Sequence, residues 1–231
     1  MQREIIPAIM PEYFEDISEL VFLVRNKVKS VQLDIMDGKY VPEKTWPFPD
    51  SGHFLSKIRS EEEFFPFWEE IDYELDLMIA RPEEQLDTWL YLGASRIIFH
   101  FASVHDWEKI KTIDEGFRNF ISLGIAVTIH DDLDAVFELI DGGHCDFVQV
   151  MGIAHIGYQG EPFEELSLGV IKKIRERYPD LIISVDGGVS LESIPSLLDA
   201  GIDRFVSGSG VFGEGSVEEN LVELEALISG E

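Results

Sequence analysis

Three aspartates in this sequence share one local pattern, and the pattern suggests proton-transfer or metal chemistry. Asp34, Asp76 and Asp186 each lie in or directly after a short run in which apolar and polar residues alternate. Successive side chains of a strand point to opposite faces, so each aspartate is expected on the face away from any surrounding helices. One buried aspartate is often only a hydrogen-bonded core residue. Three that converge must share protons, hydrogen bonds or a cation, so we expect one functional cluster.

The elements that would position these aspartates alternate regularly along the chain. Apolar or β-branched runs typical of strands occur at 5–10, 30–36, 73–79, 96–101, 125–130, 147–151, 181–185 and 204–207. Segments with apolar residues at three- and four-residue intervals, typical of amphipathic helices, lie at 12–28, 82–92, 106–123, 132–140, 164–178, 191–200 and 217–228.

This alternation predicts an α/β fold, a single (β/α)8 TIM barrel over residues 1–231. A doubly wound open sheet is the structural alternative, although it usually has fewer strands. Gly93, Gly124 and Gly201 follow predicted helices, where a left-handed residue often ends a helix. Active sites of such barrels lie at the C-terminal ends of the strands, where the three aspartates fall.

The composition excludes several classes of protein. Apolar residues make up 45% of the 231 residues, which argues against intrinsic disorder. The chain has 18 basic and 45 acidic residues, a net charge of −27, so nucleic acid is not an expected partner. No apolar run is long enough to predict a membrane span or a secretory signal, and Cys145 has no second cysteine to pair with. We therefore predict a cytoplasmic protein.

Two kinds of loop add to the predicted site. The segment 37–51 is rich in proline and glycine and is long for a strand-to-helix connection, so it is either a decorated loop or a substrate lid. Glycines follow the sixth, seventh and eighth predicted strands. Backbone N–H groups of such loops can bind phosphate without lysine or arginine. The candidate phosphate-binding residues are Gly157, Gly160, Gly187, Gly188, Gly208 and Ser209.

Four motifs carry a resemblance to a known family. They are Val31-Gln32-Leu33-Asp34-Ile35-Met36-Asp37-Gly38 with Tyr40-Val41-Pro42, Leu75-Asp76-Leu77-Met78-Ile79 with Arg81-Pro82-Glu83, Val185-Asp186-Gly187-Gly188-Val189, and Gly208-Ser209-Gly210-Val211-Phe212-Gly213. In order and spacing the chain resembles the ribulose-phosphate 3-epimerases over nearly its whole length. The resemblance implies a metal-assisted isomerase that epimerises a ketose phosphate, D-ribulose 5-phosphate to D-xylulose 5-phosphate, at C3. It also implies a homo-oligomer.

By this resemblance Asp34 and Asp186 are the two catalytic carboxylates, one acid and one base, on opposite faces of the substrate. The family's methionine floor beside the enediolate matches Met36, Met78 and Met151, although core packing is the plainer interpretation of each methionine alone. Ala8 and His100 complete the expected substrate pocket, and Ala8 replaces a serine common in the family.

The metal ligands depart from the family pattern of two histidines and two aspartates. Gln32 and Asp76 stand at the histidine positions, so the predicted set is Gln32, Asp34, Asp76 and Asp186. An all-oxygen set favours Mg²⁺, Mn²⁺ or Ca²⁺ over Zn²⁺. The alternative is that the metal is lost. His100, which matches a family histidine, and His130, where the family usually has asparagine, are candidate replacement ligands, although a wall residue is the plainer interpretation.

Three functions remain open on the sequence alone. The first is the epimerase, with Asp34 and Asp186 as its acid and base. The second is a non-catalytic barrel that binds a sugar phosphate and has lost the metal. The third is a related epimerase or isomerase acting on another sugar phosphate. Fold alone does not choose among them.

Overall fold

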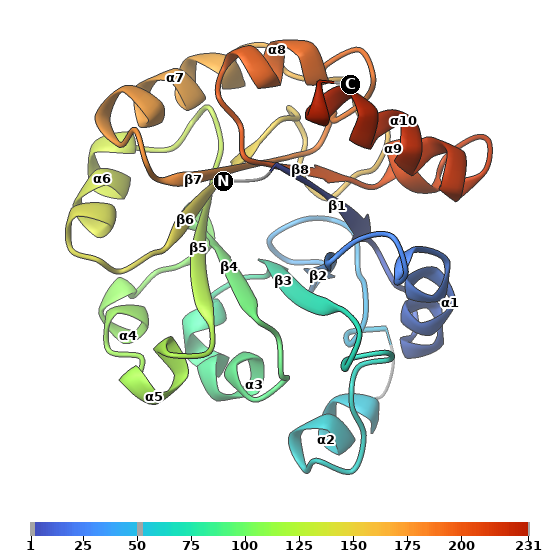
Figure 1. Ribbon diagram of the computed structural model, residues 1–231. Helices are drawn as coiled ribbons and strands as arrows, with labels where there is room; N and C mark the ends of the chain where they lie inside the picture. The colour runs from blue at the N-terminus through green and yellow to red at the C-terminus, as the bar shows by residue number, and fades with distance from the viewer. Residues whose placement is uncertain (1–2, 50–52, 231) are drawn as a thin grey trace.

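The computed structural model describes residues 3–49 and 53–230. Eight parallel strands form a closed barrel in sequence order, and helices surround it (Figure 1). The barrel closes where β1 pairs with β8. The strands are β1 (Glu4–Ile9), β2 (Ser30–Met36), β3 (Asp72–Met78), β4 (Arg96–His100), β5 (Ser122–Val127), β6 (Phe147–Met151), β7 (Ile182–Asp186) and β8 (Arg204–Ser207).

The helices follow the strands in the alternation that the sequence predicts. They are α1 (Phe14–Val24), α2 (His53–Arg59), α3 (Leu86–Leu90), α4 (Trp107–Lys111), α5 (Glu115–Arg118), α6 (Leu133–Asp141), α7 (Ser167–Arg177), α8 (Ile194–Asp199), α9 (Ser209–Phe212) and α10 (Val217–Ser229), with 3-10 turns at Pro82–Gln85 and Phe101–Ser103. Among the described residues, none of the helices is both long and apolar enough to cross a membrane.

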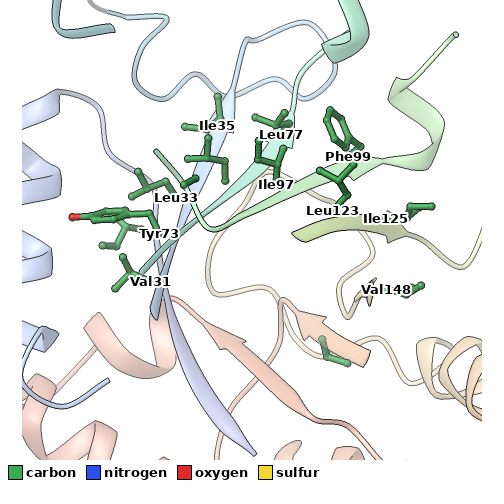
Figure 2. Close-up of a cluster of buried hydrophobic side chains, with 14 of the residues drawn as sticks. Val31, Leu33, Ile35, Tyr73, Leu77, Ile97, Phe99, Leu123, Ile125 and Val148 are labelled. Atoms are coloured by element: carbon green, nitrogen blue, oxygen red, sulfur yellow. The ribbon is translucent and has the colours of Figure 1, made fainter. Parts of the chain in front are cut away.

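The outer faces of the strands form the main hydrophobic core with the helices. Val31, Leu33 and Ile35 of β2 belong to this core, and so does Ile17 of α1. Figure 2 shows apolar side chains of β2, β3, β4, β5 and β6 in this core. The alternation predicted for β2 and β3 is therefore confirmed.

The inside of the barrel is packed differently, because polar residues divide its apolar side chains into small clusters. At its N-terminal end Glu74, only 1% exposed, accepts a hydrogen bond from Arg96 Nε at 2.6 Å. Arg204 lies near the same group and pairs with Glu4 at 3.0 Å. Buried charges need such partners. This ion-pair network lies at the start of the strands, whereas Asp34 and Asp186 lie near their C-terminal ends.

The segment after β2 is anchored in the core over part of its length. Thr45 Oγ1 donates to Asp34 O at 2.5 Å and accepts from Met36 N at 2.8 Å. Trp46 is fully buried and packs against Phe14 of α1. These contacts tie the segment to the end of β2 that carries Asp34. The expectation of a lid over 37–51 stays a prediction, and residues 50 and 51 lie outside the described residues.

The region before β5 differs from the sequence prediction. The single helix expected at 106–123 is two short helices, and Asp114 caps the second by accepting from Gly116 N at 2.7 Å. β5 begins at Ser122, so Gly124 lies inside a strand and does not end a helix. His130 lies beyond the end of β5, is exposed, and belongs to a turn in which Thr128 N donates to Asp131 Oδ2 at 2.6 Å. Gly93 and Gly201 do adopt the expected left-handed conformation. The helix α2 was not predicted.

Gly124 leaves space that the barrel interior needs. A Cβ at this position would lie 2.5 Å from Phe147 Cζ and 3.1 Å from Ile98 Cγ1. We predict that Gly124→Ala lowers the free energy of unfolding by about 1–3 kcal/mol, as overpacking does. Urea denaturation followed by circular dichroism measures this change in the free energy of unfolding.

Gly169→Ala is the matched control. A Cβ at Gly169, in α7, meets nothing within 4 Å, so we expect it to stabilise the protein by up to about 1 kcal/mol. Equal stability changes in the two variants would contradict this account of Gly124.

Candidate active site

The three aspartates predicted from the sequence meet inside the barrel. One carboxylate oxygen each of Asp34, Asp76 and Asp186 lies within 4.8 Å of the others, and all three residues are buried. They come from β2, β3 and β7, and the parallel register pairs Asp34 with Asp76. Because inward side chains of neighbouring strands lie side by side in a barrel, the register alone brings these two together. The closure of the barrel brings Asp186 to them.

A buried amide links the first and third carboxylates. Gln32 Nε2 donates to Asp34 Oδ1 and to Asp186 Oδ2, at 2.8 Å each. Gln149 Nε2, from β6, donates to the same Asp186 Oδ2 at 3.3 Å. Both glutamines are fully buried. Asp34 Oδ2 and Asp186 Oδ1 accept no hydrogen bond from the described residues and are not among the fully enclosed polar atoms, so each reaches open space. Each carboxylate thus has one held oxygen and one free oxygen.

Asp76 has a different partner. His100 Nε2, at the end of β4, lies 2.9 Å from Asp76 Oδ1, and both side chains are almost fully buried. Asp76 Oδ2 and His100 Nδ1 are enclosed and have no hydrogen-bond partner among the described residues. An unpaired buried carboxylate oxygen is costly. Asp76 Oδ2 is therefore a buried oxygen that a bound cation could satisfy.

Burial and mutual repulsion favour protons on the cluster. Burial raises the pKa of Asp186 to about 7, with the charge of Asp76 as the next cause. Burial, then the charges of Asp186 and Asp76, raise the pKa of Asp34 well above its usual range. The Gln32 hydrogen bonds oppose both shifts, because a donated hydrogen bond stabilises the ionised carboxylate. Asp186, whose pKa is raised to about 7, and Asp34, whose pKa is raised by burial and by the neighbouring charges, are suited to exchange protons with a substrate.

A pocket opens above Asp34 and Asp186 at the C-terminal ends of the strands. Most of the candidate residues predicted from the sequence line it. They are Ala8, Asp34, Met78, Met151, Gly157, Gly160, Asp186, Gly187, Gly188, Gly208 and Ser209.

Four other candidates lie behind this lining. Gln32 and Asp76 are below it, in the interior of the barrel, and reach the pocket through Asp34 and Asp186. Met36 is fully buried and packs against Met78 and Val41, not against the pocket. His100 lies behind the pocket lining, in contact with Asp76 and with the ring of Tyr40. His130 is exposed, and the cluster of carboxylates does not include it.

The loops after β6, β7 and β8 supply glycines and polar residues to the pocket wall. Gly188 has φ +68°, and a Cβ there would lie 2.5 Å from the Phe163 Cα, so only glycine fits. The loop after β6 also places Tyr158, Gln159 and Glu161 in the lining. The sequence motifs did not predict these three residues, although they lie between or beside the glycines of the same loop. The sequence motifs did not predict Gln149 either. The one indication in the sequence is an amide side chain on the inward face of β6.

Comparison with known proteins places this chain in a family. The sequence model of the ribulose-phosphate 3 epimerase family matches residues 4–212. The chain belongs to this family. Its relatives include the ribulose-phosphate 3-epimerase of Treponema pallidum, 30% identical over 198 residues that cover 84% of this chain and 83% of that protein. The ribulose-phosphate 3-epimerase of Schizosaccharomyces pombe is 26% identical over 220 residues, covering 95% and 91%.

Solved structures show the same fold at low sequence identity. KGPDC from Streptococcus mutans superposes with a TM-score of 0.73 at 12% identity, covering 99% of this chain and 98% of that one. A 3-hexulose-6-phosphate synthase gives a TM-score of 0.67 at 19% identity, covering 98% and 99%. These likenesses support the TIM barrel and nothing more specific.

Two acidic residues in the motifs that resemble the family, Asp37 and Glu83, accept hydrogen bonds from backbone N–H groups of the loops. Asp37 Oδ1 accepts from Lys39 N at 2.8 Å and Tyr40 N at 3.1 Å, and its Oδ2 accepts from Ala80 N at 3.0 Å. Asp37 thus fixes the loop after β2 to the end of β3. Glu83 is buried and accepts from a backbone N–H after β4 at 3.1 Å. Both hold the loops around the pocket in place.

The donor set fits a hard divalent cation. Three carboxylates converge, and two enclosed oxygens of the cluster, Asp76 Oδ2 and Gln32 Oε1, accept no hydrogen bond from the described residues. Mg²⁺ and Mn²⁺ prefer oxygen ligands, whereas Zn²⁺ sites in proteins favour imidazole and thiolate. A cation would also remove the repulsion that raises the pKa values of Asp34 and Asp186. The cluster can therefore hold a metal ion.

The raised pKa values predict a pH-dependent stability for the metal-free protein. A carboxyl whose pKa rises on folding stabilises the folded state below its unfolded pKa near 4, and the contribution is lost as the pH rises through the folded value. For Asp186 that window ends at about pH 7. We expect Asp76→Asn to reduce the loss of melting temperature between pH 5 and pH 8, because it removes a repelling charge. Thermal melts followed by circular dichroism in the presence of a chelator measure the melting temperature at each pH.

The net charge of −27 lowers stability with rising pH for a separate reason. Glu223→Gln, which removes an exposed carboxylate from α10, controls for that general effect. The same pH dependence in wild type and in the Asp76→Asn variant would contradict the burial and repulsion described for the cluster.

Proposed function

We propose that this protein is an isomerase that interconverts D-ribulose 5-phosphate and D-xylulose 5-phosphate at C3. The observation that carries the proposal is the pair of buried carboxylates, Asp34 and Asp186, joined through Gln32 at the floor of a pocket with a glycine-rich wall. Family membership and relatives named ribulose-phosphate 3-epimerase support the same reaction.

Epimerisation needs one group that removes the C3 proton and another that returns a proton to the opposite face. Asp34 Oδ2 and Asp186 Oδ1 are the free oxygens for these two tasks. Their mutual repulsion and raised pKa values favour a state in which one carboxyl is protonated and the other is ionised. Such a pair supplies an acid and a base from the same residue type. Removal of the proton gives the enediolate, and protonation by the other carboxyl gives the epimer.

The phosphate would bind at the loops after β6, β7 and β8. Gly187, Gly188, Gly208 and Ser209 line the pocket there, with Gly157 and Gly160 on the loop after β6. Among the described residues lining the pocket there is no lysine or arginine, so backbone N–H groups would bind the anion. Phosphate sites in this fold commonly use the loops after the last two strands.

A divalent cation would bind to Asp34, Asp76, Asp186 and Gln32, with Mg²⁺ or Mn²⁺ favoured over Zn²⁺ by the oxygen donors. When bound, it would supply Lewis acidity toward the oxygen that gains charge in the enediolate. Met78 and Met151 line the pocket beside the carboxylates and would exclude water from that charge. Met36 supports Met78 from below.

The reaction is tested by proton NMR of D-ribulose 5-phosphate in D₂O with protein that has been chelated and then supplied with Mn²⁺ or Mg²⁺. We expect metal-dependent loss of the C3 proton and formation of xylulose 5-phosphate. Asp34→Asn and Asp186→Asn should each lower the rate by at least about 10²-fold, since each removes an acid–base group.

Asp199→Asn, on the exposed surface of α8, is the control and should leave the rate unchanged. No exchange in the wild-type protein with any metal would reject this substrate. Calorimetric binding without turnover would then support the non-catalytic barrel, and exchange of a different ketose phosphate would support the related isomerase.

Metal binding is tested separately from activity. We expect titration calorimetry of the chelated protein to show that Mn²⁺ and Mg²⁺ bind, and that Asp76→Ala weakens binding by at least about tenfold, since it removes a ligand. Glu223→Gln is again the surface control. Unchanged affinity in the Asp76→Ala variant would remove Asp76 from the ligand set.

A further inference from the structure

Gln149 is a polar residue in an apolar part of the barrel. It lies on β6 between two inward apolar residues, Phe147 and Met151, which belong to one small cluster of buried side chains. Its side chain is fully buried and does not line the pocket. A buried amide without hydrogen bonds costs free energy. The one hydrogen bond that its side chain makes among the described residues therefore points to its role.

That hydrogen bond goes to one of the two proposed acid–base groups. Gln149 Nε2 donates to Asp186 Oδ2 at 3.3 Å, and Gln32 Nε2 donates to the same oxygen at 2.8 Å. The two glutamines come from β6 and β2, which lie on opposite sides of the closed barrel. Asp186 Oδ2 is thus held from two sides, whereas Asp34 Oδ1 accepts from Gln32 alone among the described residues. The two carboxylates differ in how firmly they are held.

We propose that Gln149 is a positioning residue for Asp186 in the epimerisation, an inference that rests on the proposed function. It holds Oδ2 and so orients the carboxylate with its free oxygen, Oδ1, toward the pocket. Asp34 makes no hydrogen bond with Gln149, so proton transfer through Asp34 does not depend on it. Gln149 therefore assists proton transfer at one face of the substrate and not at the other.

The surroundings of the amide fix its orientation. Gln149 Oε1 is enclosed and accepts no hydrogen bond from the described residues. Rotating the amide by half a turn would place this oxygen against Asp186 Oδ2, where two acceptors repel each other. The N–H group is therefore the useful end of the side chain. Replacement by methionine keeps the length and shape of the side chain and removes only the donor.

The two halves of the reaction can be measured separately by hydrogen exchange. With purified protein supplied with Mn²⁺ in D₂O, loss of the C3 proton is followed by NMR at early times, from D-ribulose 5-phosphate in one sample and D-xylulose 5-phosphate in another. Each epimer gives up its proton to a different carboxylate. We expect Gln149→Met to slow this exchange by about tenfold for one epimer, the size expected from losing a hydrogen bond to a charged group.

Exchange from the other epimer should stay within about twofold of wild type, and KM should change little for either substrate, because Gln149 does not touch the pocket. A loss of packing alone would slow both epimers together. Equal slowing of both, or no slowing of either, would overturn the proposal. Absence of exchange in the wild-type protein would overturn the proposed function and this role with it, so the two failures are distinct.

Two further variants keep the test decisive. Ile98→Val removes one methylene from a fully buried residue of the barrel interior and has no polar contact, so it should leave the ratio of the two exchange rates unchanged. If Gln149→Met does not fold, as judged by circular dichroism, Gln149→Asn draws the amide back by one methylene and should produce the same one-sided loss. An unchanged ratio in that variant would also overturn the proposal.

Discussion

Repulsion among three buried carboxylates governs how the interior of this barrel is built. Asp34, Asp76 and Asp186 lie within 4.8 Å of one another, in surroundings where charge is expensive. The molecule lowers that cost with the amide of Gln32, which donates to two of them, and with His100, which lies against the third. The remaining charge needs protons or a cation. Protonation of a carboxylate and binding of a cation would thus each reduce the repulsion among the three aspartates.

The carboxylate cluster lies inside the barrel, whereas the main hydrophobic core lies between the strands and the helices. The outer faces of the strands pack with the helices in one hydrophobic core, and the three aspartates lie on the inside of the barrel. A second set of buried charges, Glu74 with Arg96 and Arg204, is neutralised at the start of the strands. The cluster at the other end is left short of positive charge. A stable hydrophobic core can support an interior site that lowers the stability of the protein.

The acidity of the chain fits the way in which its proposed substrate would bind. A protein with a net charge of −27 has few cations to offer a phosphate, and the described pocket lining has no lysine or arginine. Backbone N–H groups supply fixed partial positive charge that does not alter net charge. The close approach of Gly188 to Phe163 shows why glycine is needed for such a wall.

Local sequence patterns were enough to predict the barrel, the inward faces of β2, β3 and β7, and the three aspartates, because period-two alternation and eight repeats are local signals. They misplaced the start of β5, because α4 ends at Lys111 and a second short helix, capped by Asp114, follows within a few residues. The folded arrangement was needed to show which oxygens are held and which are free, that Met36 lies behind Met78, and that Gln149 reaches Asp186. Met36–Met78 and Gln149–Asp186 are contacts between paired neighbouring strands, and Gln32–Asp186 joins β2 to β7 within the closed barrel. The side-chain positions in the folded barrel set these distances, and the local sequence pattern does not give them.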